Sequence, residues 1–318
     1  MAFMNQAPMV DQPFGKVAVM FGGSSAERDV SLKSGHAVLD ALLSLGIDAH
    51  GFDPAEQDLS ELMVADFQRV VIMLHGRGGE DGSLQGALQQ LNLPYTGSGV
   101  LGSALCMDKI RCKQVWQSVG LATANYEIAD KRDFDGGTCE AIMDRLGNTV
   151  MVKPAQEGSS IGMAKVTNAA QLTCAVHNAF KYDDKVLLEQ FIHGYEYTVG
   201  ILAGKTLPSI SMSTPRDFYD YTAKYQAAST EYFCPSGLSE EQETLLADLS
   251  LKAFDAVAGS GWGRVDFMQD LLGKFYLLEA NTVPGMTKKS LMPLAAKQAG
   301  MSFTQLSKAI LTTADFIK

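Results

Sequence analysis

The sequence lacks the features that mark secreted, membrane-spanning and nucleic-acid-binding proteins. Its five cysteines form neither a CxxC pair nor a disulfide-like framework, which favours a reducing compartment. No apolar run approaches the length of a membrane span, and residues 1–15 lack the basic and apolar parts of a secretory signal. A formal net charge of -10 disfavours nucleic acid as a partner. These absences predict a cytoplasmic protein that binds neither nucleic acid nor membrane.

Two fingerprints of phosphate-binding loops are also missing. The apolar run at residues 70–74 leads into HGRGGEDGSLQG (75–86), but this segment lacks the third glycine of GxGxxG, and GxxxxGK[ST] occurs nowhere. A dinucleotide-binding turn and a P-loop are therefore excluded. His75, at the end of the predicted strand, either contacts a substrate or fixes the loop by hydrogen bonding.

At 318 residues the chain is long enough for two or three α/β domains. Residues 16–21, a polar loop and a helical pattern that stops at Gly46 predict the first half of a βαβ unit. Glu27 lies in that loop or in the first helical turn, at the carboxyl end of the strand. Open α/β sheets place ligand groups there, but a glutamate can equally complement a helix N-terminus.

The most informative stretch is GRVDFMQDLLGKFYLLEANTVPG at residues 263–285, whose two apolar runs predict a pair of strands. Arg264 and Asp266 share one face of the first strand, because alternate residues of a strand point the same way. Glu279 and Asn281 share a face of the second. Two carboxylates and an amide oxygen suit Mg²⁺. The alternative is a hairpin with a solvated polar face and a surface ion pair.

Two lysines stand where phosphates could meet them. Lys109 occupies the first turn of a helix that Asp108 opens, where its charge opposes the helix dipole, although such a lysine is more often a surface residue. Lys153 ends the predicted strand 149–155 and precedes a loop rich in glycine and serine, residues 156–163. The N–H groups and hydroxyls of such a loop can cover phosphates, though loops of this kind are weakly specific alone.

Residues 185–192 and 196–202 are expected to be strands of the same sheet. Glu189 interrupts the first of them, where its carboxylate could meet a flat ligand such as adenine or pair with a lysine. The segment between Pro215 and Pro235 is long, holds four tyrosines and has little apolar periodicity, which predicts a lid. These residues together favour nucleotide-dependent phosphoryl transfer without naming the acceptor.

The motifs carry a further resemblance, which runs from residue 16 to about residue 311. The matching segments are GGSSAERDVSLKSG (22–35), HGRGGEDGSLQG (75–86), MDKIRCK (107–113), VKPAQEGSSIGM (152–163), and GRVDFM with LLEANTVPGMT (263–287). In this combination and order the chain resembles the D-alanine:D-alanine ligases of the ATP-grasp superfamily. It departs from their pattern at Lys289, where His is common, and at Gln190, where Lys is common.

The resemblance implies an α/β protein with the ATP-grasp fold, in which an N-terminal parallel-sheet domain precedes two α+β domains that clasp the nucleotide. The expected parts are a flexible tail at 1–15, an N-terminal domain at 16–97, a central subdomain at 98–187 and a C-terminal subdomain at 188–318. The lid would lie at about 215–230. A homodimer is the expected assembly.

The resemblance also implies how ATP and its metal ions would be bound. Two Mg²⁺ ions, with Mn²⁺ as an alternative, would bridge the β and γ phosphates. The implied ligands are Lys109 and Lys153 for the phosphates, Glu189 and the backbone near Ile192 for adenine, Glu196 for the ribose, and Asp266, Glu279 and Asn281 for the metal ions.

Further residues are implied for the two D-alanine substrates. Glu27 would receive the ammonium group of the first D-alanine. Ser290 and Lys224 would bind the carboxylate of the second, and Lys224 is also expected at the nucleotide site. Arg264 and the Gly285 N–H would form an oxyanion hole. Glu27, Ser159 and Tyr225 would make the hydrogen-bonded trio that fastens the lid.

The implied reaction is ATP-dependent joining of two D-alanine molecules through an acyl phosphate, with release of ADP and phosphate, for peptidoglycan precursor synthesis. In the family, tyrosine at the position of Tyr225 goes with dipeptide synthesis. The nearest alternative is a related ligase that uses D-lactate. A non-catalytic nucleotide-binding regulator is the other alternative, and it would have no use for an oxyanion donor such as Arg264.

Overall fold

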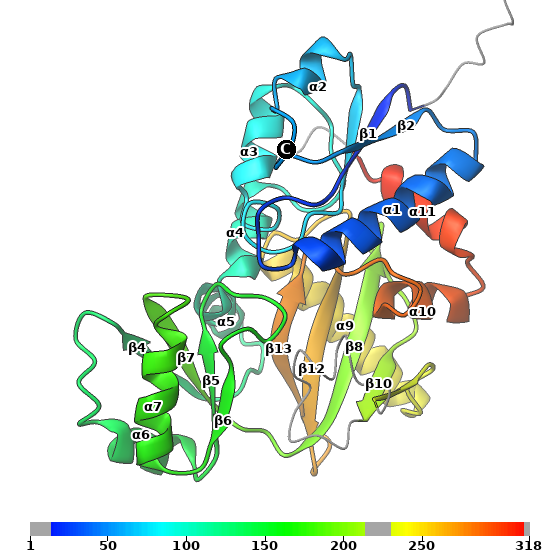
Figure 1. The fold of residues 1–318 in the computed structure, drawn as a ribbon. Helices are drawn as coiled ribbons and strands as arrows, with labels where there is room; N and C mark the ends of the chain where they lie inside the picture. The colour runs from blue at the N-terminus through cyan, green and yellow to red at the C-terminus, as the bar shows by residue number, and fades with distance from the viewer. Residues whose placement is uncertain (1–13, 214–229, 315–318) are drawn as a thin grey trace, which may run out of the picture.

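The computed structural model describes residues 14–213 and 230–314, and their strands form three sheets (Figure 1). The first sheet is parallel, with β1 (Val17–Met20) between β2 (Ala49–Phe52) and β3 (Arg69–Ile72). All four residues of β1 are buried. A strand buried on both faces explains why its sequence is an unbroken apolar run rather than an alternating one.

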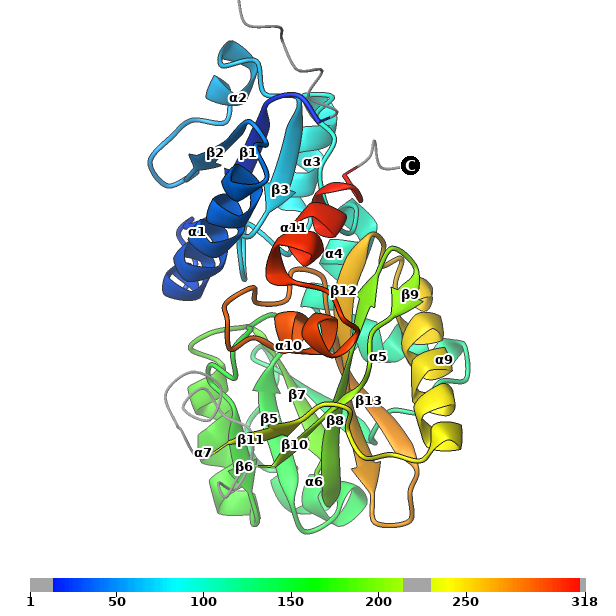
Figure 2. The ribbon, with the colours of Figure 1, turned by 90° about the vertical axis from the view of Figure 1, so that its right-hand side faces the viewer.

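Helices from both ends of the chain pack on this first sheet (Figure 2). Leu306, Ile310 and Leu311 of the last helix share a hydrophobic core with the first strand. The helices of this region are α1 (Arg28–Ser44), α2 (Glu61–Val64), α3 (Ser83–Gln90), α10 (Leu291–Gln298) and α11 (Phe303–Leu311).

The second sheet is antiparallel and has the order β4-β7-β5-β6. The helices α6 (Cys139–Leu146) and α7 (Ala169–Ala179) contribute to its hydrophobic core. Its strands are β4 (Tyr126–Asp130), β5 (Val150–Pro154), β6 (Ala164–Val166) and β7 (Lys185–Gln190).

The third sheet is also antiparallel, with the order β11-β10-β8-β12-β13 and β9 paired with β8. Trp116 and Phe254 lie in the core that its helices share with it. Its strands are β8 (Gly194–Leu202), β9 (Lys205–Thr206), β10 (Ile210–Ser213), β11 (Glu231–Phe233), β12 (Trp262–Asp270) and β13 (Phe275–Asn281), and its helices are α4 (Val100–Met107), α5 (Lys109–Ser118) and α9 (Glu240–Ala256).

The expectation that residues 185–192 and 196–202 belong to one sheet is wrong. β7 pairs with β4 and β5, whereas β8 pairs with β12 along its whole length. The chain enters the third sheet at Gly194, the first residue of β8, where a Cβ atom would lie 1.8 Å from the Gln269 carbonyl oxygen. Local apolar patterns identify strands, but the partner of a strand depends on contacts distant in sequence.

The order of the sheets agrees with the predicted architecture of one parallel α/β region followed by two antiparallel α+β regions. The boundaries proposed at residues 98 and 188 stay predictions. Within the described ranges, no helix combines the length and the apolarity required to span a membrane.

A close approach of α4 to the end of α9 leads to a test of the packing. A Cβ atom on Gly102 would lie 2.2 Å from the Ala258 carbonyl oxygen. Because backbone cannot move aside as a side chain can, we expect Gly102→Ala to lower the free energy of unfolding by about 1–3 kcal/mol. Urea unfolding followed by circular dichroism measures this loss.

Gly86→Ala is the matched control, because Gly86 is also helical and its Cβ would meet nothing nearer than 3.8 Å. It should leave stability unchanged or raise it by up to about 1 kcal/mol. Equal unfolding midpoints for the two variants would contradict the packing described for α4.

Candidate active site

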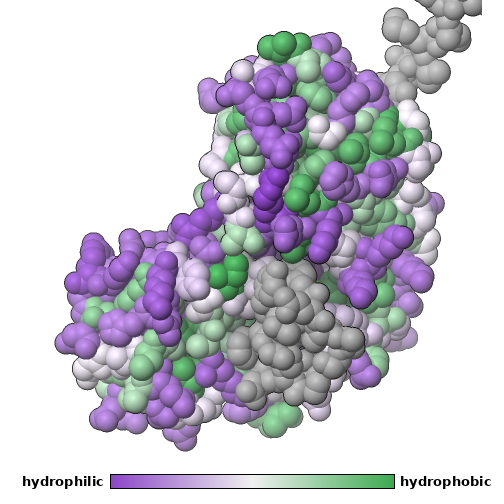
Figure 3. All heavy atoms as spheres, viewed as in Figure 1, coloured by the Kyte–Doolittle hydropathy of each residue, from purple (hydrophilic) through white to green (hydrophobic). Residues whose placement is uncertain are grey.

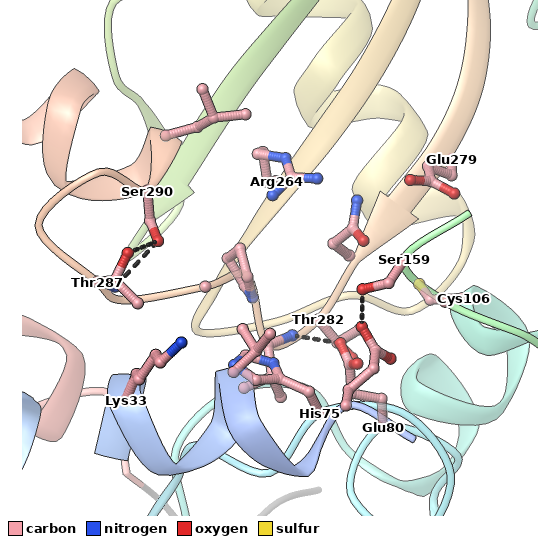
Figure 4. Close-up of a pocket in the computed structure, with 18 of the residues that line it drawn as sticks. Lys33, His75, Glu80, Cys106, Ser159, Arg264, Glu279, Thr282, Thr287 and Ser290 are labelled. Carbon is pink, nitrogen blue, oxygen red and sulfur yellow. Dashed lines mark hydrogen bonds between the residues drawn. The ribbon is translucent and has the colours of Figure 1, made fainter. Parts of the chain in front are cut away.

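A cavity of about 680 Å³ opens between segments that belong to all three sheet regions. Glu27 comes from the first region, Ser159 from a loop of the second and Arg264 from the third. Ser159 and Arg264 are labelled in the close-up (Figure 4). The space-filling view shows the outline of the molecule indented between the lobe of α6 and α7 and the lobe of α2 and α3 (Figure 3). The cavity therefore has walls that are distant from one another in sequence.

One wall of the site is the hairpin of β12 and β13. Arg264 pairs in register with Asn281, and Asp266 with Glu279, so the four polar side chains lie together. Arg264 Nε and Nη2 donate to the two carboxylate oxygens of Asp266 at 2.8 and 2.7 Å. Asn281 Nδ2 donates to Asp266 Oδ2 at 3.1 Å. The predicted convergence is confirmed, and the solvated-face alternative is wrong because Asp266 is only 5% exposed.

The oxygen atoms of this wall could supply some of the ligands of a hard divalent cation. Two carboxylates and one amide oxygen are ligands that Mg²⁺ accepts, and Mg²⁺ often completes its shell with phosphate oxygens. In the described residues, no three His, Cys, Asp or Glu side chains gather as a metal site by themselves. Asp266, Glu279 and Asn281 therefore fit a cation that arrives together with a phosphate ligand.

A second, narrower cavity of about 100 Å³ adjoins the first, and the two share Lys109, Ser159 and Glu279 in their linings. Its walls carry apolar groups such as Leu278, which suit a flat ring. The residues predicted for the phosphates, adenine and ribose all line it, namely Lys109, Lys153, Glu189, Ile192 and Glu196.

The two lysines predicted for phosphates already have oxygen partners. Lys109 Nζ donates to the Glu157 carbonyl oxygen at 2.6 Å and lies 3.9 Å from Glu279 Oε2. Lys109 is 9% exposed, so the alternative that it is a surface residue is wrong. Lys153 Nζ donates to Glu189 Oε2 at 2.6 Å. Lys109 thus presents positive charge to both cavities, and Lys153 to the narrow one.

The sequence left two roles open for Glu189, a contact with adenine and an ion pair with a lysine, and the structure shows the ion pair. Its two carboxylate oxygens are ion-paired with Lys113 and Lys153, and the residue is 2% exposed. Burial alone would raise the pKa of Glu189, but the two lysines outweigh it and hold the pKa below its ordinary value. The residue also lines the narrow cavity, so its contact with adenine stays a prediction.

Glu27 and Ser159 meet across the larger cavity. Ser159 Oγ donates to Glu27 Oε1, in a loop where Ser159 and Ser160 have φ of 50° and 61°. Glu27 is the N-cap residue of α1 and makes no side-chain capping bond there, but its charge still lies at the helix N-terminus, so the two interpretations of Glu27 both stay open. Tyr225 and Lys224 lie outside the described residues, and the trio and lid assigned to them stay predictions.

The segment around Gly285 is held from the first sheet region, which sequence reasoning missed. Glu80 Oε1 accepts the Val283 N–H at 3.1 Å and Oε2 accepts the Gly76 N–H at 2.8 Å. Ser34 Oγ accepts the Met286 N–H at 3.1 Å. Glu80 could have been singled out from the sequence, because it is a charged residue in the glycine-rich loop that follows β3. These bonds fix the backbone on both sides of the predicted oxyanion donor.

His75 and Ser290 occupy opposite sides of this segment (Figure 4). His75 Nε2 lies 3.2 Å from Ser34 Oγ, in agreement with the hydrogen-bonding role, and burial lowers the pKa of His75 to about 4. His75 also lines the larger cavity, so a contact with substrate stays a prediction. Ser290 Oγ accepts the Thr287 N–H at 2.9 Å and would lie 3.1 Å from a Cβ on Gly285. Ser290 and the Gly285 backbone are therefore neighbours in the cavity.

Comparison with known proteins identifies the family. Residues 115–312 match the family model described as "D-ala D-ala ligase C-terminus". The D-alanine–D-alanine ligase of Pseudoalteromonas atlantica is 77% identical over 301 residues, which is 95% of this chain and 95% of that protein. The chain belongs to the D-alanine–D-alanine ligase family. The ligase of Idiomarina loihiensis is 58% identical, over 94% of this chain and 96% of its own.

Solved ligases have the same fold. The D-alanine–D-alanine ligase of Bacillus anthracis complexed with ATP is 30% identical, with a TM-score of 0.81 over 94% of this chain and 96% of that one. VanG D-Ala:D-Ser ligase of Enterococcus faecalis is 27% identical, with a TM-score of 0.80 over 95% and 99% of the two chains. The predicted ATP-grasp fold, family and class of enzyme, an ATP-dependent ligase of D-alanine, are confirmed.

The carboxyl group of Glu80 should make stability depend on pH. Burial, and next the neighbouring Glu27, raise the pKa of Glu80 from 4.5 to about 8. A carboxyl group with a raised pKa binds its proton more tightly in the folded state, so its contribution to stability is full below the ordinary pKa and is lost as pH rises to about 8. We expect the unfolding free energy of the wild type, relative to Glu80→Gln, to fall between about pH 5 and pH 8.

Asp81→Asn is the neighbouring control for this titration. Hydrogen bonds from Ser83 and Gly78 outweigh partial burial and lower the pKa of Asp81, so its contribution changes only in more acidic solution. Across the same pH range its difference from the wild type should stay constant. A Glu80→Gln difference that is equally flat in urea titrations would contradict the raised pKa.

Proposed function

We propose that the described site performs the ligation of two D-alanine molecules, with the residue roles predicted from the sequence. The observation that carries this proposal is the register of β12 and β13, which brings Arg264, Glu279 and Asn281 into the wall of the larger cavity, with Glu279 shared by both cavities. Asp266 is hydrogen-bonded to Arg264 and Asn281 beside them. The narrow cavity would receive the adenosine part of ATP and the larger one the two amino acids. The terminal phosphates would lie between them.

Binding in this arrangement is chiefly charge neutralisation. Lys109 and Lys153, which both line the narrow cavity, would neutralise phosphate oxygens. Glu27 would receive the ammonium group of the first D-alanine and thereby direct its carboxylate to the terminal phosphate. Because a carboxylate acylates amines poorly, transfer of the phosphoryl group to it creates an acyl phosphate with a good leaving group.

Asp266, Glu279 and Asn281 would hold two Mg²⁺ ions, or Mn²⁺ in their place. Bound Mg²⁺ would withdraw negative charge from the phosphates during transfer. In the described structure, the Arg264 guanidinium compensates the charge of Asp266. Both partners are side chains of one strand, so Arg264 can turn toward a substrate oxygen when another cation faces Asp266.

The second half of the reaction forms the peptide bond. The neutral amine of the second D-alanine attacks the acyl carbon, a C–N bond forms, and the carbonyl oxygen gains negative charge. Arg264 and the Gly285 N–H would stabilise that oxygen, after which the C–O bond to phosphate breaks and inorganic phosphate leaves. Ser290 would bind the carboxylate of the second D-alanine, beside Gly285. Lys224 and Tyr225 are proposed to act from the lid, which would keep water from the acyl phosphate.

Removal of the Arg264 guanidinium tests the oxyanion role. Arg264→Ala should lower kcat by about 10²-fold to 10³-fold, because a preorganised donor to the developing charge is lost. Arg264→Lys keeps the positive charge but loses the paired N–H donors of the guanidinium, so its kcat should lie between those of the wild type and Arg264→Ala. Phosphate release with saturating ATP and D-alanine measures the rate, and circular dichroism verifies the fold.

Arg132→Ala is a matched control, because Arg132 makes the same two-bond pair with an aspartate two residues away, Asp130, but is 82% exposed. Its removal should leave kcat unchanged. Near-normal turnover by a folded Arg264→Ala enzyme would refute the assigned role.

Substrate choice decides between the proposed reaction and its relatives. With ATP and Mg²⁺, D-alanine should release phosphate and L-alanine should not. The D-lactate-using alternative predicts faster release when D-lactate is added to D-alanine, and mass spectrometry of the product then shows a depsipeptide. The regulator alternative predicts nucleotide binding without any D-alanine-dependent release. Phosphate release with L-alanine at the same rate would contradict the assigned substrate.

We further propose a cytoplasmic location and a homodimeric assembly. The location is supported by the use of ATP and by five cysteines that all remain free thiols in the described structure. The dimer stays a prediction from the sequence, which light scattering of the purified chain measures directly.

A further inference from the structure

A second buried lysine stands behind the nucleotide cavity, and none of the roles described above uses it. Lys113 lies one helical turn after Lys109 in α5, and its side chain is completely buried. Within the described part of the chain it lines neither cavity. A fully buried lysine is rare and needs a partner, so its position calls for a specific reason.

The partners of Lys113 come from two strands and from the segment between α5 and β4. Its Nζ is ion-paired with Glu189 Oε1 of β7, donates to Thr123 Oγ1, and lies 3.4 Å from the Leu277 carbonyl oxygen of β13. Helix α5 lies between the second sheet and β13, so these partners surround the ammonium group (Figure 1). Lys113 is therefore held in place on the side of Glu189 that faces away from the cavity.

Lys153 contacts the same carboxylate from the cavity side. It pairs with Glu189 Oε2 at 2.6 Å and also lines the narrow cavity, where its side chain is 10% exposed. Lys153 and Glu189 lie on one face of adjacent strands, since Glu189 is opposite Met151, two residues before Lys153. Lys153 can thus turn toward a ligand, whereas Lys113 cannot leave the protein interior.

The triad of Lys113, Glu189 and Lys153 contains two basic groups and one acidic group. A buried carboxylate that loses its partner is strongly unfavourable, so Lys153 could not leave Glu189 unless another cation remained there. The lysines together hold the pKa of Glu189 below its ordinary value, in agreement with a carboxylate that stays ionised. Lys113 supplies the cation that remains.

We propose that Lys113 is a positioning residue for nucleotide binding: it compensates the charge of Glu189 so that Lys153 can turn from this carboxylate to a phosphate of the bound nucleotide. This inference rests on the proposed function of Lys153 and Glu189. It deepens that function by explaining how a lysine that is ion-paired with a buried carboxylate becomes available to an anion. If Lys113 had only a structural role, its replacement would weaken the binding of ligands with and without phosphates by the same factor.

The test compares two ligands that share adenine and ribose and differ in phosphate. Dissociation constants for MgADP and for adenosine are measured by isothermal titration calorimetry on the full chain and on Lys113→Met. With Lys113 gone, Lys153 is retained by Glu189, so MgADP should bind about ten-fold or more weakly, the scale of one lost charged hydrogen bond, while adenosine changes less than about three-fold. Weakening of both ligands by the same factor, or of neither, would overturn the proposal.

A second substitution makes the mechanism specific. In Glu189→Gln the carboxylate that retains Lys153 is removed, while the amide oxygen can still face adenine. Adding Lys113→Met to Glu189→Gln should therefore leave MgADP affinity within about three-fold of Glu189→Gln alone. A further ten-fold loss in this background would also overturn the proposal. If Lys113→Met fails to fold, Lys113→Gln keeps a donor, removes only the charge, and carries the same expectation.

Thr123→Val is the matched control, because it removes the hydroxyl partner of Lys113 and leaves the ion pair with Glu189 intact. It should lower thermal stability without changing the ratio of the two dissociation constants. A larger change of that ratio in Thr123→Val than in Lys113→Met would contradict the role of Glu189. Absence of MgADP binding by the wild type would refute the proposed function itself, so the two failures are distinguishable.

Discussion

The antiparallel register of β12 and β13 is the constraint on which the site depends. Arg264 faces Asn281 and Asp266 faces Glu279, so one hairpin presents a cation, two carboxylates and an amide at one place. A shift of the register by one residue would turn Glu279 and Asn281 to the opposite face of the sheet, away from Arg264 and Asp266. Thr198 Oγ1 of β8 also donates to Asp266, so the central strand of the sheet stabilises the same arrangement.

The site also requires contacts that join distant parts of the chain. Glu80 and Ser34 hold the backbone around Gly285 from the first sheet region, although more than 200 residues separate them from it. Ser159 brings the glycine- and serine-rich loop to Glu27. The cavity between the regions is thus shaped by hydrogen bonds across it as well as by the hydrophobic cores on each side.

The local sequence pattern predicted where the strands lie better than it predicted which strands pair with one another. The alternation of apolar and polar residues in the β12–β13 hairpin predicted both the strands and the face of Arg264 and Asp266, because the turn fixes the pairing of adjacent strands. The same reasoning placed β7 and β8 in one sheet, and it failed because strand partners are chosen by tertiary packing. Lys113 could not have been predicted as buried, since nothing in its helix distinguishes it from a surface lysine until Glu189 is placed beside it.

The shared core of the first sheet and the last helix has a consequence for biosynthesis. Val17 to Met20 leave the ribosome early, yet their hydrophobic cluster includes Leu306 and Ile310, and Arg69 bonds the Ala314 carbonyl oxygen at 2.9 Å. The packing of β1 therefore stays incomplete until α11 has been synthesised. Nascent chains that stop short of α11 will expose apolar surface at their beginning, which makes them substrates for chaperones and proteases.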